Sequence, residues 1–494
     1  MAPLMKKGWL FAILLVLAFT GCPDPNSPTP AELIPETIPI PETTPPAEKS
    51  LAKIEIVTPP AKIDYLLGDI PDFNDLVIKN IYTDGTESLT SEYDIRYDTF
   101  TAGTRTVTII SKEQSELTAS FDITVAETLI DTGLPVIYLD TVNGQEITSR
   151  EDYLKTNIKI VDAANPGNNL ENTAYKDEIR GRGNTSWGAP KKPYRIKFDK
   201  KTSLFGYEKA KSWVLLANYL DPTLLMNTVA FELGARFGLP FTNHYQHVEL
   251  VLNGTYQGSY VLTEQVQVGK GRVDIDEDDG FLVELDRYYD EDPKFRTDVY
   301  QLPVMIKSPE DLSDPTGYDF VKNSINALEA ALQGDSFPES GYRDLINMDT
   351  FVDFILINEI VDNGELGWPK STYMYKDAGA AKISMGPLWD FDWGFGSPGN
   401  YFIHADRRTG MHSFFRRFFD DPVFRTQYKA HWNTHYGDIA DIVSFIDATA
   451  ASLEKSQVLN AGRWEAVDYA QIISRMKTWW MQRMAYLDTE INKY

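Results

Sequence analysis

The chain has 494 residues, a single cysteine, 12% aromatic residues and a formal net charge of −25 at pH 7. This length suffices for two or three domains with hydrophobic cores. The negative charge argues against nucleic acid as a partner, because phosphate binding needs a basic surface. One cysteine excludes disulfides within the chain and metal sites built from several thiolates.

The N-terminus has the features of an export signal. Lys6 and Lys7 form a short basic region, and an apolar run from Trp9 to Phe19 follows. A basic patch, a short apolar stretch and small residues before a cleavage point predict a signal peptide over residues 1–21. The run is shorter than the roughly 20 residues of a membrane span. Removing the peptide takes away Lys6 and Lys7, so the mature chain has a net charge of −27.

Gly21-Cys22 resembles a bacterial lipobox, in which the cysteine is diacylated and becomes the new N-terminus, although Phe19 stands where such boxes usually carry Leu. The alternative is an ordinary secretory signal with a chance cysteine. Residues 22–50 are rich in Pro, Thr, Glu and Ser, a composition that stiffens the chain and cannot form a core. We therefore expect an exported lipoprotein of the bacterial cell envelope or surface, tethered to the membrane through the lipid on Cys22 alone.

Residues 51–127 are predicted to form a small all-β domain. Short alternating or β-branched segments, separated by turns such as Asp84-Gly85, favour a sandwich. These segments are 52–56, 77–82, 106–110 and 121–125. The order of Gly68-Asp69, Tyr82 to Thr86 and Gly103 to Val107 resembles bacterial Ig-like domains of surface proteins. Such domains serve mostly as spacers or adhesion modules, so we assign no catalytic residue here.

From about residue 128 the pattern changes to mixed α and β. Asp221-Pro222 has the sequence of a helix start, and Gly238 that of a helix end. Strands are predicted at 135–139, 195–198 and 280–285, and a hairpin at 248–252 and 256–266 around the turn Asn253-Gly254. Beyond residue 314 the pattern is mostly helical, with one interruption at 363–396.

The interruption contains the most unusual chemistry. Asp390 and Asp392 lie two residues apart among aromatic residues and glycines. Aromatic walls strengthen the hold of carboxylates on a divalent cation, and hard oxygen ligands suit Mg²⁺ or Mn²⁺. The alternative is a turn whose acids cap backbone amides. Paired acids also suit glycoside cleavage, so a glycan-acting protein is another hypothesis.

Three further groups of residues could carry chemistry. Arg180-Gly181-Arg182-Gly183 would let backbone amides and arginines approach an anion, and the following Lys191, Lys192, Arg195 and Lys197 form a basic run, or else a solvated strand face. Glu365 follows a predicted helix that begins at Thr350, where it could act as a base or belong to an ordinary loop. His431 and His435 have the spacing of a zinc pair, but without a Glu between them they do not make a metalloprotease helix.

Taken in order, these segments resemble the CotH family (spore coat protein H-like kinases), which has an atypical protein-kinase-like fold. The matching segments are Arg180 to Ser186, Pro190 to Phe198, Trp213 to Asp221, Leu252 to Gln265, Gly280 to Asp286, Asn358-Glu359 and Gly386 to Asp392. The resemblance implies an α+β protein: a kinase-like body with a helical C-terminal part over residues 128–494, preceded by the Ig-like sandwich.

The resemblance also implies a function. The expected activity is transfer of the γ-phosphate of ATP to Ser or Thr of a secreted or surface protein, with Mg²⁺ or Mn²⁺. Asp390 would bind the metal with Asp392 beside it, and Glu365 would act as the base. Arg180 and Arg182 would lie over the phosphates.

A lysine on a strand is expected to contact the phosphates as well. Lys197 is the first candidate, with Glu232 on the next helix as its ion-pair partner. Lys192 is the rival lysine, and Glu264 the rival acid.

Two departures from the family pattern bear on activity. Where the family tends to show Asn-x-Asp, this chain has Asn363-Gly364-Glu365, and Ser371 stands where a metal-binding amide is expected. The extra methylene of Glu365 moves its carboxylate by roughly 1 Å, a misplacement that can lower a rate about 10²-fold. A weak or inactive kinase-like binding module at the cell surface is therefore the main alternative function.

Overall fold

The computed structural model describes residues 49–66, 71–97, 103–126, 130–310, 312, 315–379, 381–396, 402, 410–464 and 466–494. The signal peptide, Cys22, nearly all of the predicted tether, the Gly68-Asp69 motif and the predicted domain boundary at 127–128 lie outside these residues. Within the described part of the chain, no helix combines the length and hydrophobicity that a membrane span needs.

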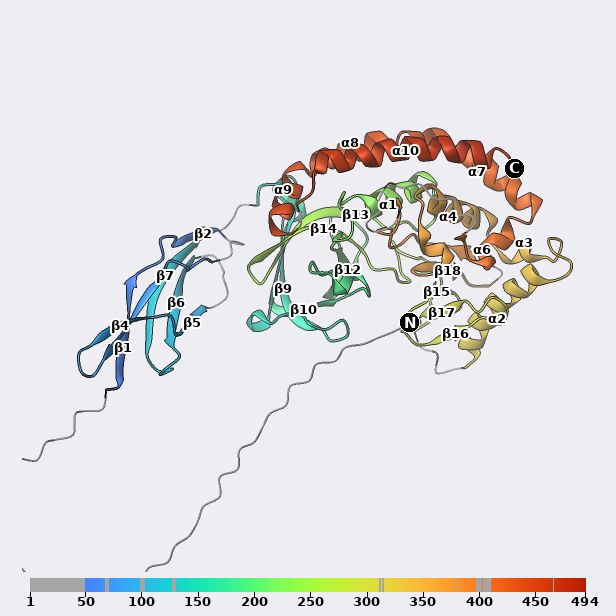
Figure 1. The fold of residues 1–494 in the computed structure, drawn as a ribbon. Coiled ribbons are helices and arrows are strands. Elements are labelled where there is room, and N and C mark those ends of the chain that lie inside the picture. Colours follow the sequence, from blue (N-terminus) through green and yellow to red (C-terminus); the bar gives the residue numbers. More distant parts are fainter. Residues whose placement is uncertain are drawn as a thin grey trace, which may run out of the picture. The chain divides into compact units, whose positions relative to one another are not determined.

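The N-terminal domain is all β, as predicted (Figure 1). One sheet has the strand order β1-β3-β4 and the other β2-β7-β6-β5. The strands are β1 (Leu51–Thr58), β2 (Asp64–Leu66), β3 (Val77–Tyr82), β4 (Glu87–Thr90), β5 (Tyr93–Tyr97), β6 (Gly103–Ser111) and β7 (Thr118–Ala126). Alternate apolar residues such as Val107 and Ile109 of β6 form the buried core, and the residues between them face outward.

The next part of the chain folds into a closed barrel with the strand order β10-β11-β12-β14-β13-β8-β9. Its strands are β8 (Val136–Thr141), β9 (Leu154–Val161), β10 (Leu170–Gly181), β11 (Tyr194–Thr202), β12 (Ala210–Leu216), β13 (Tyr245–Leu252) and β14 (Thr255–Glu264). Short 3₁₀ turns lie at η1 (Val142–Gly144), η2 (Pro166–Asn168) and η3 (Ser186–Gly188). The predicted hairpin is confirmed: Asn253 and Gly254 both have positive φ, as the tight turn between β13 and β14 requires.

The helix predicted to begin at Asp221-Pro222 begins later, as α1 (Met226–Arg236). Leu224 has φ +62°, a left-handed conformation that no helix can include, so the chain turns once before the helix starts. Asp221 still acts at this end, because its carboxylate accepts a hydrogen bond from the Met226 amide at 2.8 Å. The predicted end is confirmed, with Gly238 at φ +68°.

A five-stranded sheet with the order β16-β17-β15-β18-β19 follows the barrel. Its strands are β15 (Phe281–Leu285), β16 (Lys294–Arg296), β17 (Pro303–Ser308), β18 (Thr372–Lys376) and β19 (Ser384–Met385). Helices α2 (Pro315–Gln333), α3 (Tyr342–Leu345) and α4 (Met348–Ile360) come between β17 and β18, followed by η4 (Gly364–Gly367). Helix α4 is buried along almost its whole length, which makes it the central helix of the largest hydrophobic core.

The C-terminal part is helical, as predicted, with α6 (Ser413–Phe418), α7 (Pro422–Ala440), α8 (Ile442–Ser452), α9 (Glu454–Arg463) and α10 (Tyr469–Ile491). Of these helices, α7 to α10 form a layer along one side of the barrel and the second sheet (Figure 1). Arg483 of α10 is buried and donates to the carbonyl of Glu359 at 3.1 Å, so α10 supports the end of α4. Mixed α+β architecture is thus confirmed, while the likeness to a protein kinase stays a prediction.

Candidate functional site

A polar cleft of about 760 Å³ is lined by residues of both the barrel and the five-stranded sheet. The barrel contributes β10, β11 and the turn at 182–186. The other side comes from the end of β15, from β17, and from the segments 370–373 and 389–393. The cleft therefore brings together the arginine-glycine turn and the Asp390-Asp392 pair, which are about 200 residues apart in the sequence.

On the barrel side, Arg180 of β10 and Arg195 of β11 lie directly opposite each other in the antiparallel register. Like charges in such a pair destabilise a sheet. Among the described residues, none accepts a hydrogen bond from Nε of either arginine. Burial lowers the pKa of Arg195, and the charge of Arg180 adds to this effect. The two guanidinium groups thus place two positive charges side by side at the cleft, where a bound anion would relieve their repulsion.

The turn after β10 is held close to both sides of the cleft. A Cβ atom at Gly181 would collide with the ring of Trp187, so only glycine allows this packing. The Arg182 guanidinium lies 5.1 Å from the ring centroid of Trp389, which is the residue before Asp390 in the chain. The hydroxyl groups of Thr185 and Tyr288 are 2.9 Å apart and join the turn to the opposite wall.

Asp390 and Asp392 lie on an irregular segment that α1 holds in place. Asp390 has φ +63°, a strained conformation for a residue other than glycine, and such strain is concentrated at functional sites. The buried side chain of Asn227 accepts a hydrogen bond from the Phe391 amide at 2.7 Å. Burial raises the pKa of Asp392 well above its usual range, and the Asp390 carboxylate adds to this rise. A bound cation would relieve this repulsion between carboxylates.

Asp286, at the end of β15, is a third carboxylate of the cleft. Its oxygens accept hydrogen bonds from the amides of Tyr288 at 2.8 Å and Ser371 at 3.3 Å. The Ser371 hydroxyl lies 3.4 Å from Oδ2 of Asp390, so Ser371 connects the two carboxylates. Burial raises the pKa of Asp286.

Glu365, the predicted base, lies in η4 and is not among the residues that line the cleft. Lys370 Nζ is 3.1 Å from its Oε1, and the exposed fractions of the two side chains are 8% for Lys370 and 5% for Glu365. Burial raises the pKa of Glu365 to about 7, opposed by Lys370 and reinforced by the Asp390 charge. The Lys370 ammonium also lies 4.6 Å from the Trp393 ring centroid. The neighbouring acid Asp362 is buried 3.8 Å from Arg483 and does not line the cleft.

The donor set fits a metal–nucleotide pair. Asp286, Asp390 and Asp392 supply hard oxygen ligands of the kind that Mg²⁺ and Mn²⁺ prefer. The guanidinium groups of Arg180, Arg182 and Arg195 line the same cleft and are of the kind that binds phosphate oxygens. The cleft thus has cationic donors on one side and carboxylates on the other, as a phosphate–metal complex requires.

Residues 179–487, more than half of the chain, match the family described as CotH kinase protein. The chain belongs to the CotH family. Residues 58–125 match the bacterial Ig-like domain, group 3, which is typical of extracellular or surface proteins. No curated protein matches the chain. The CotH match includes every residue that lines the cleft except Arg150, Glu151 and Tyr153.

The structure corrects one expectation drawn from the CotH resemblance, because Lys197 and Glu232 do not pair. Lys197 stands opposite Glu178 in the register, with Nζ 3.6 Å from its carboxylate. Glu232 instead binds Arg236 one helical turn away, at 2.8 Å. Neither residue lines the cleft. Lys197 and Glu232 do not form an ion pair because each of them has another partner of opposite charge nearby.

The rival residues also lie outside the cleft lining. Lys192 Nζ donates to the Trp187 carbonyl at 2.7 Å, beneath the arginine-glycine turn. Glu264 is buried and accepts from His244 Nδ1 at 2.8 Å. This hydrogen bond raises the pKa of His244. These contacts indicate that Lys192 and Glu264 support the walls of the cleft.

The structure adds Asp286, Lys307, Lys370 and Asn227, for which no sequence pattern indicated a role, and it singles out Arg195 from the basic run. Arg195 is two residues before Lys197 and therefore on the same strand face, so the basic run already contained it. Lys307 of β17 lies 3.2 Å from Glu284 and also lines the cleft. Asn227 carries no local signal, because its partner is distant in the sequence.

Proposed function

We propose that this CotH-family chain is a surface protein kinase that transfers the γ-phosphate of ATP to Ser or Thr of a protein substrate. The observation that carries the proposal is the meeting of Arg180, Arg182 and Arg195 with Asp390 and Asp392 in one cleft. Phosphoryl transfer needs little more from a protein than positioning and the neutralisation of charge. The cleft combines cationic groups from the barrel side with carboxylates from the segment that follows β19.

In the proposed reaction, the substrate hydroxyl oxygen forms a bond to the γ-phosphorus as the bond to the β–γ bridging oxygen breaks. ADP leaves, and the hydroxyl proton passes to the Glu365 carboxylate. The arginines bind the phosphate oxygens, and Lys370 holds Glu365 in place through the 3.1 Å ion pair. Asp390 and Asp392, with Asp286 beside them, would hold Mg²⁺ or Mn²⁺, which neutralises charge on the phosphates.

The proposed location at the cell surface follows from two features of the N-terminal region, Cys22 and the Ig-like domain. A lipid on Cys22 would fix the chain to the bacterial cell envelope, and the Ig-like domain would separate the kinase-like body from the membrane. Labelling with a radioactive lipid precursor would test the anchor: the wild-type chain should incorporate label, and C22A should not. Incorporation by C22A would contradict the lipoprotein assignment.

The kinase proposal is tested with the full chain, labelled ATP, Mn²⁺ and a set of Ser- and Thr-containing proteins. Wild type should transfer label, and D390N should lose transfer by at least about 10²-fold. D290N is the matched control, because Asp290 also lines the cleft but is exposed. Absence of transfer, together with no thermal stabilisation by Mn²⁺ and ATP, would overturn the proposal in favour of a kinase-like binding module.

A further inference from the structure

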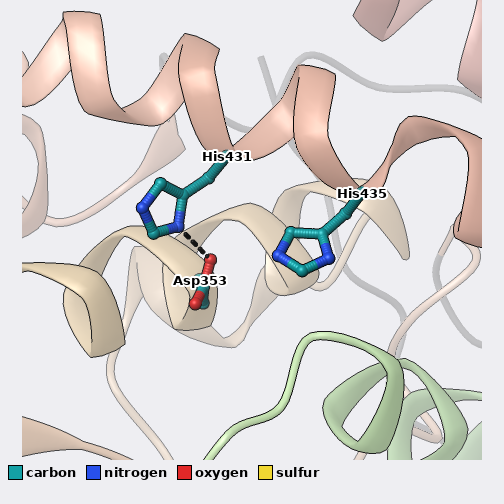
Figure 2. Close-up of side chains that lie close together, drawn as sticks. All are labelled: Asp353, His431 and His435. Atoms are coloured by element: carbon teal, nitrogen blue, oxygen red, sulfur yellow. Dashed lines mark hydrogen bonds and ion pairs between the residues drawn. The ribbon is translucent and has the colours of Figure 1, made fainter.

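A second group of ligand-type side chains lies between α4 and α7, away from the cleft. Asp349 and Asp353 are one turn apart on α4, and His431 and His435 are one turn apart on α7. His431 Nδ1 is 2.7 Å from Asp353 Oδ1, and its Nε2 is 3.4 Å from Asp349 Oδ1. Figure 2 shows that Asp353 and both histidines point into the same space between the helices. None of the four residues lines the cleft.

The donor atoms are close enough to share one ion. One ligand atom each from Asp353, His431 and His435 lies within 4.8 Å of the others. A tetrahedral ion with bonds of about 2.0–2.2 Å places neighbouring ligand atoms about 3.3–3.6 Å apart. Binding of the ion would draw these three atoms closer together. Asp349 lies at the Nε2 edge of His431, with 71% of its side chain exposed, and would have to turn toward Asp353 to complete the set.

The surroundings favour a defined site over a chance meeting. The His435 ring stacks on Phe237 with centroids 4.2 Å apart and an interplanar angle of 22°, which fixes its plane. Asp353 is buried, and among the described residues its hydrogen-bond partner is His431. The ion pairs of His431 with Asp353 and Asp349 account for three of the residues. They give no reason for a second histidine, His435, one turn further along α7.

We propose that Asp349, Asp353, His431 and His435 form a binding site for a divalent transition-metal ion, with Zn²⁺ as the best match. Two imidazole nitrogens and two carboxylate oxygens make the four-coordinate set that Zn²⁺ accepts. Mg²⁺ and Ca²⁺ prefer oxygen ligands alone, so this site differs in chemistry from the carboxylates of the cleft. The missing Glu between the histidines agrees with a structural ion rather than a hydrolytic one.

The ion would join two helices of the largest core. Helix α4 leads directly into η4, which carries Glu365, and α7 belongs to the C-terminal helical layer. An ion that binds only the folded chain stabilises it by mass action. At 100 times the dissociation constant, we expect the melting temperature of the metal-free chain to rise by about 3 °C or more.

The test is calorimetric titration of the full, metal-free chain with Zn²⁺, together with the visible absorption of Co²⁺, which reports tetrahedral coordination. We expect one ion per chain. H435Q should weaken Zn²⁺ binding at least tenfold while it keeps the His431–Asp353 hydrogen bond. D349N changes an exposed residue and provides a second variant should H435Q fold poorly. H244Q is the matched control, because His244 also bonds a buried carboxylate but belongs to no group of three ligand-type residues in the described part of the chain.

The outcomes separate this site from the cleft. D390N should bind Zn²⁺ as the wild type does. No Zn²⁺ binding by the wild type would overturn the proposal, as would equal affinity in H435Q, D349N and H244Q. Loss of Zn²⁺ binding in D390N but not in H435Q would place the ion in the cleft, which also overturns it. None of these results depends on whether the chain transfers phosphate.

Discussion

Lys370 Nζ lies 3.1 Å from Glu365 Oε1, and both side chains are almost completely buried. Burial of two charges costs free energy that their mutual attraction must offset, so such a pair adds little to stability on balance. Lys370 connects Glu365 to the cleft, which it lines itself. The Glu that replaces the expected Asp is therefore part of an organised pair.

Replacing Glu365 by Gln tests its role as the base. The amide cannot accept the substrate proton, so we expect transfer to fall by about 10²–10⁴-fold, while ATP affinity changes little. Initial rates and nucleotide binding are measured on the same preparations. E151Q is the control, since Glu151 lines the cleft and is exposed. Undiminished transfer by E365Q would show that another group accepts the proton.

Phosphate binding should depend on Arg195 rather than on Lys197. Arg195 faces Arg180 and lines the cleft, whereas Lys197 is paired with Glu178 and does not line it. Hydrogen bonds to charged groups contribute about 1.5–3 kcal/mol, so R195A should weaken Mn²⁺–ATP binding about 10–100-fold. K197A changes the same face of the same strand and should leave binding within about twofold. The reverse order of effects would restore Lys197 as the phosphate ligand.

The contrast between Arg195 and Lys197 shows how far the sequence could go. Local runs such as Arg180 to Gly183 and Asp390 to Asp392 were sufficient to identify candidate residues, and the turn Asn253-Gly254 to identify a hairpin. Choosing between Arg195 and Lys197 required knowledge of the residue that lies opposite each of them on β10. That pairing is set by the long-range register of the two strands, which no local pattern reveals. The site roles themselves stay predictions.

Other features depended on contacts that no local pattern reveals. The start of α1 was shifted by the left-handed conformation of Leu224, a residue without a turn signal. The histidine pair of α7 was visible from its spacing, but Asp349 and Asp353 of α4 became its partners only through helix packing. The α+β architecture could be predicted because strand and helix periodicities are local properties.

Asn227 should position the Asp390-Asp392 segment. N227A removes the acceptor for the Phe391 amide and leaves that amide unpaired, a loss of about 1–3 kcal/mol. We expect the Mn²⁺ concentration for half-maximal transfer to rise about tenfold. T228V is the control: it changes the next residue of α1, whose hydroxyl lies 3.1 Å from His247 Nε2. If both variants lose stability alike and neither shifts the Mn²⁺ dependence, Asn227 has only a structural role.

Lys191 joins the barrel to α9, because its ammonium group lies beneath that helix and donates to Asn460 Oδ1 at 2.8 Å. Burial lowers the pKa of Lys191 to about 7, although the charges of Glu249 and Asp221 oppose this. In the unfolded chain the lysine keeps its ordinary pKa near 10.4. Between these two values the unfolded state binds more protons than the folded state, so stability should rise with pH.

The measurement is the free energy of unfolding of wild type and K191M between pH 7 and 9.5. The difference between them should change in favour of the wild type as pH rises, by at most about 1.4 kcal/mol per pH unit. Below pH 7 the difference should become constant, because the lysine is then charged in both states. K192M replaces the adjacent lysine, whose partner is a backbone carbonyl. A pH-independent difference for K191M, or the same slope for K192M, would mean that Lys191 stays charged beneath α9.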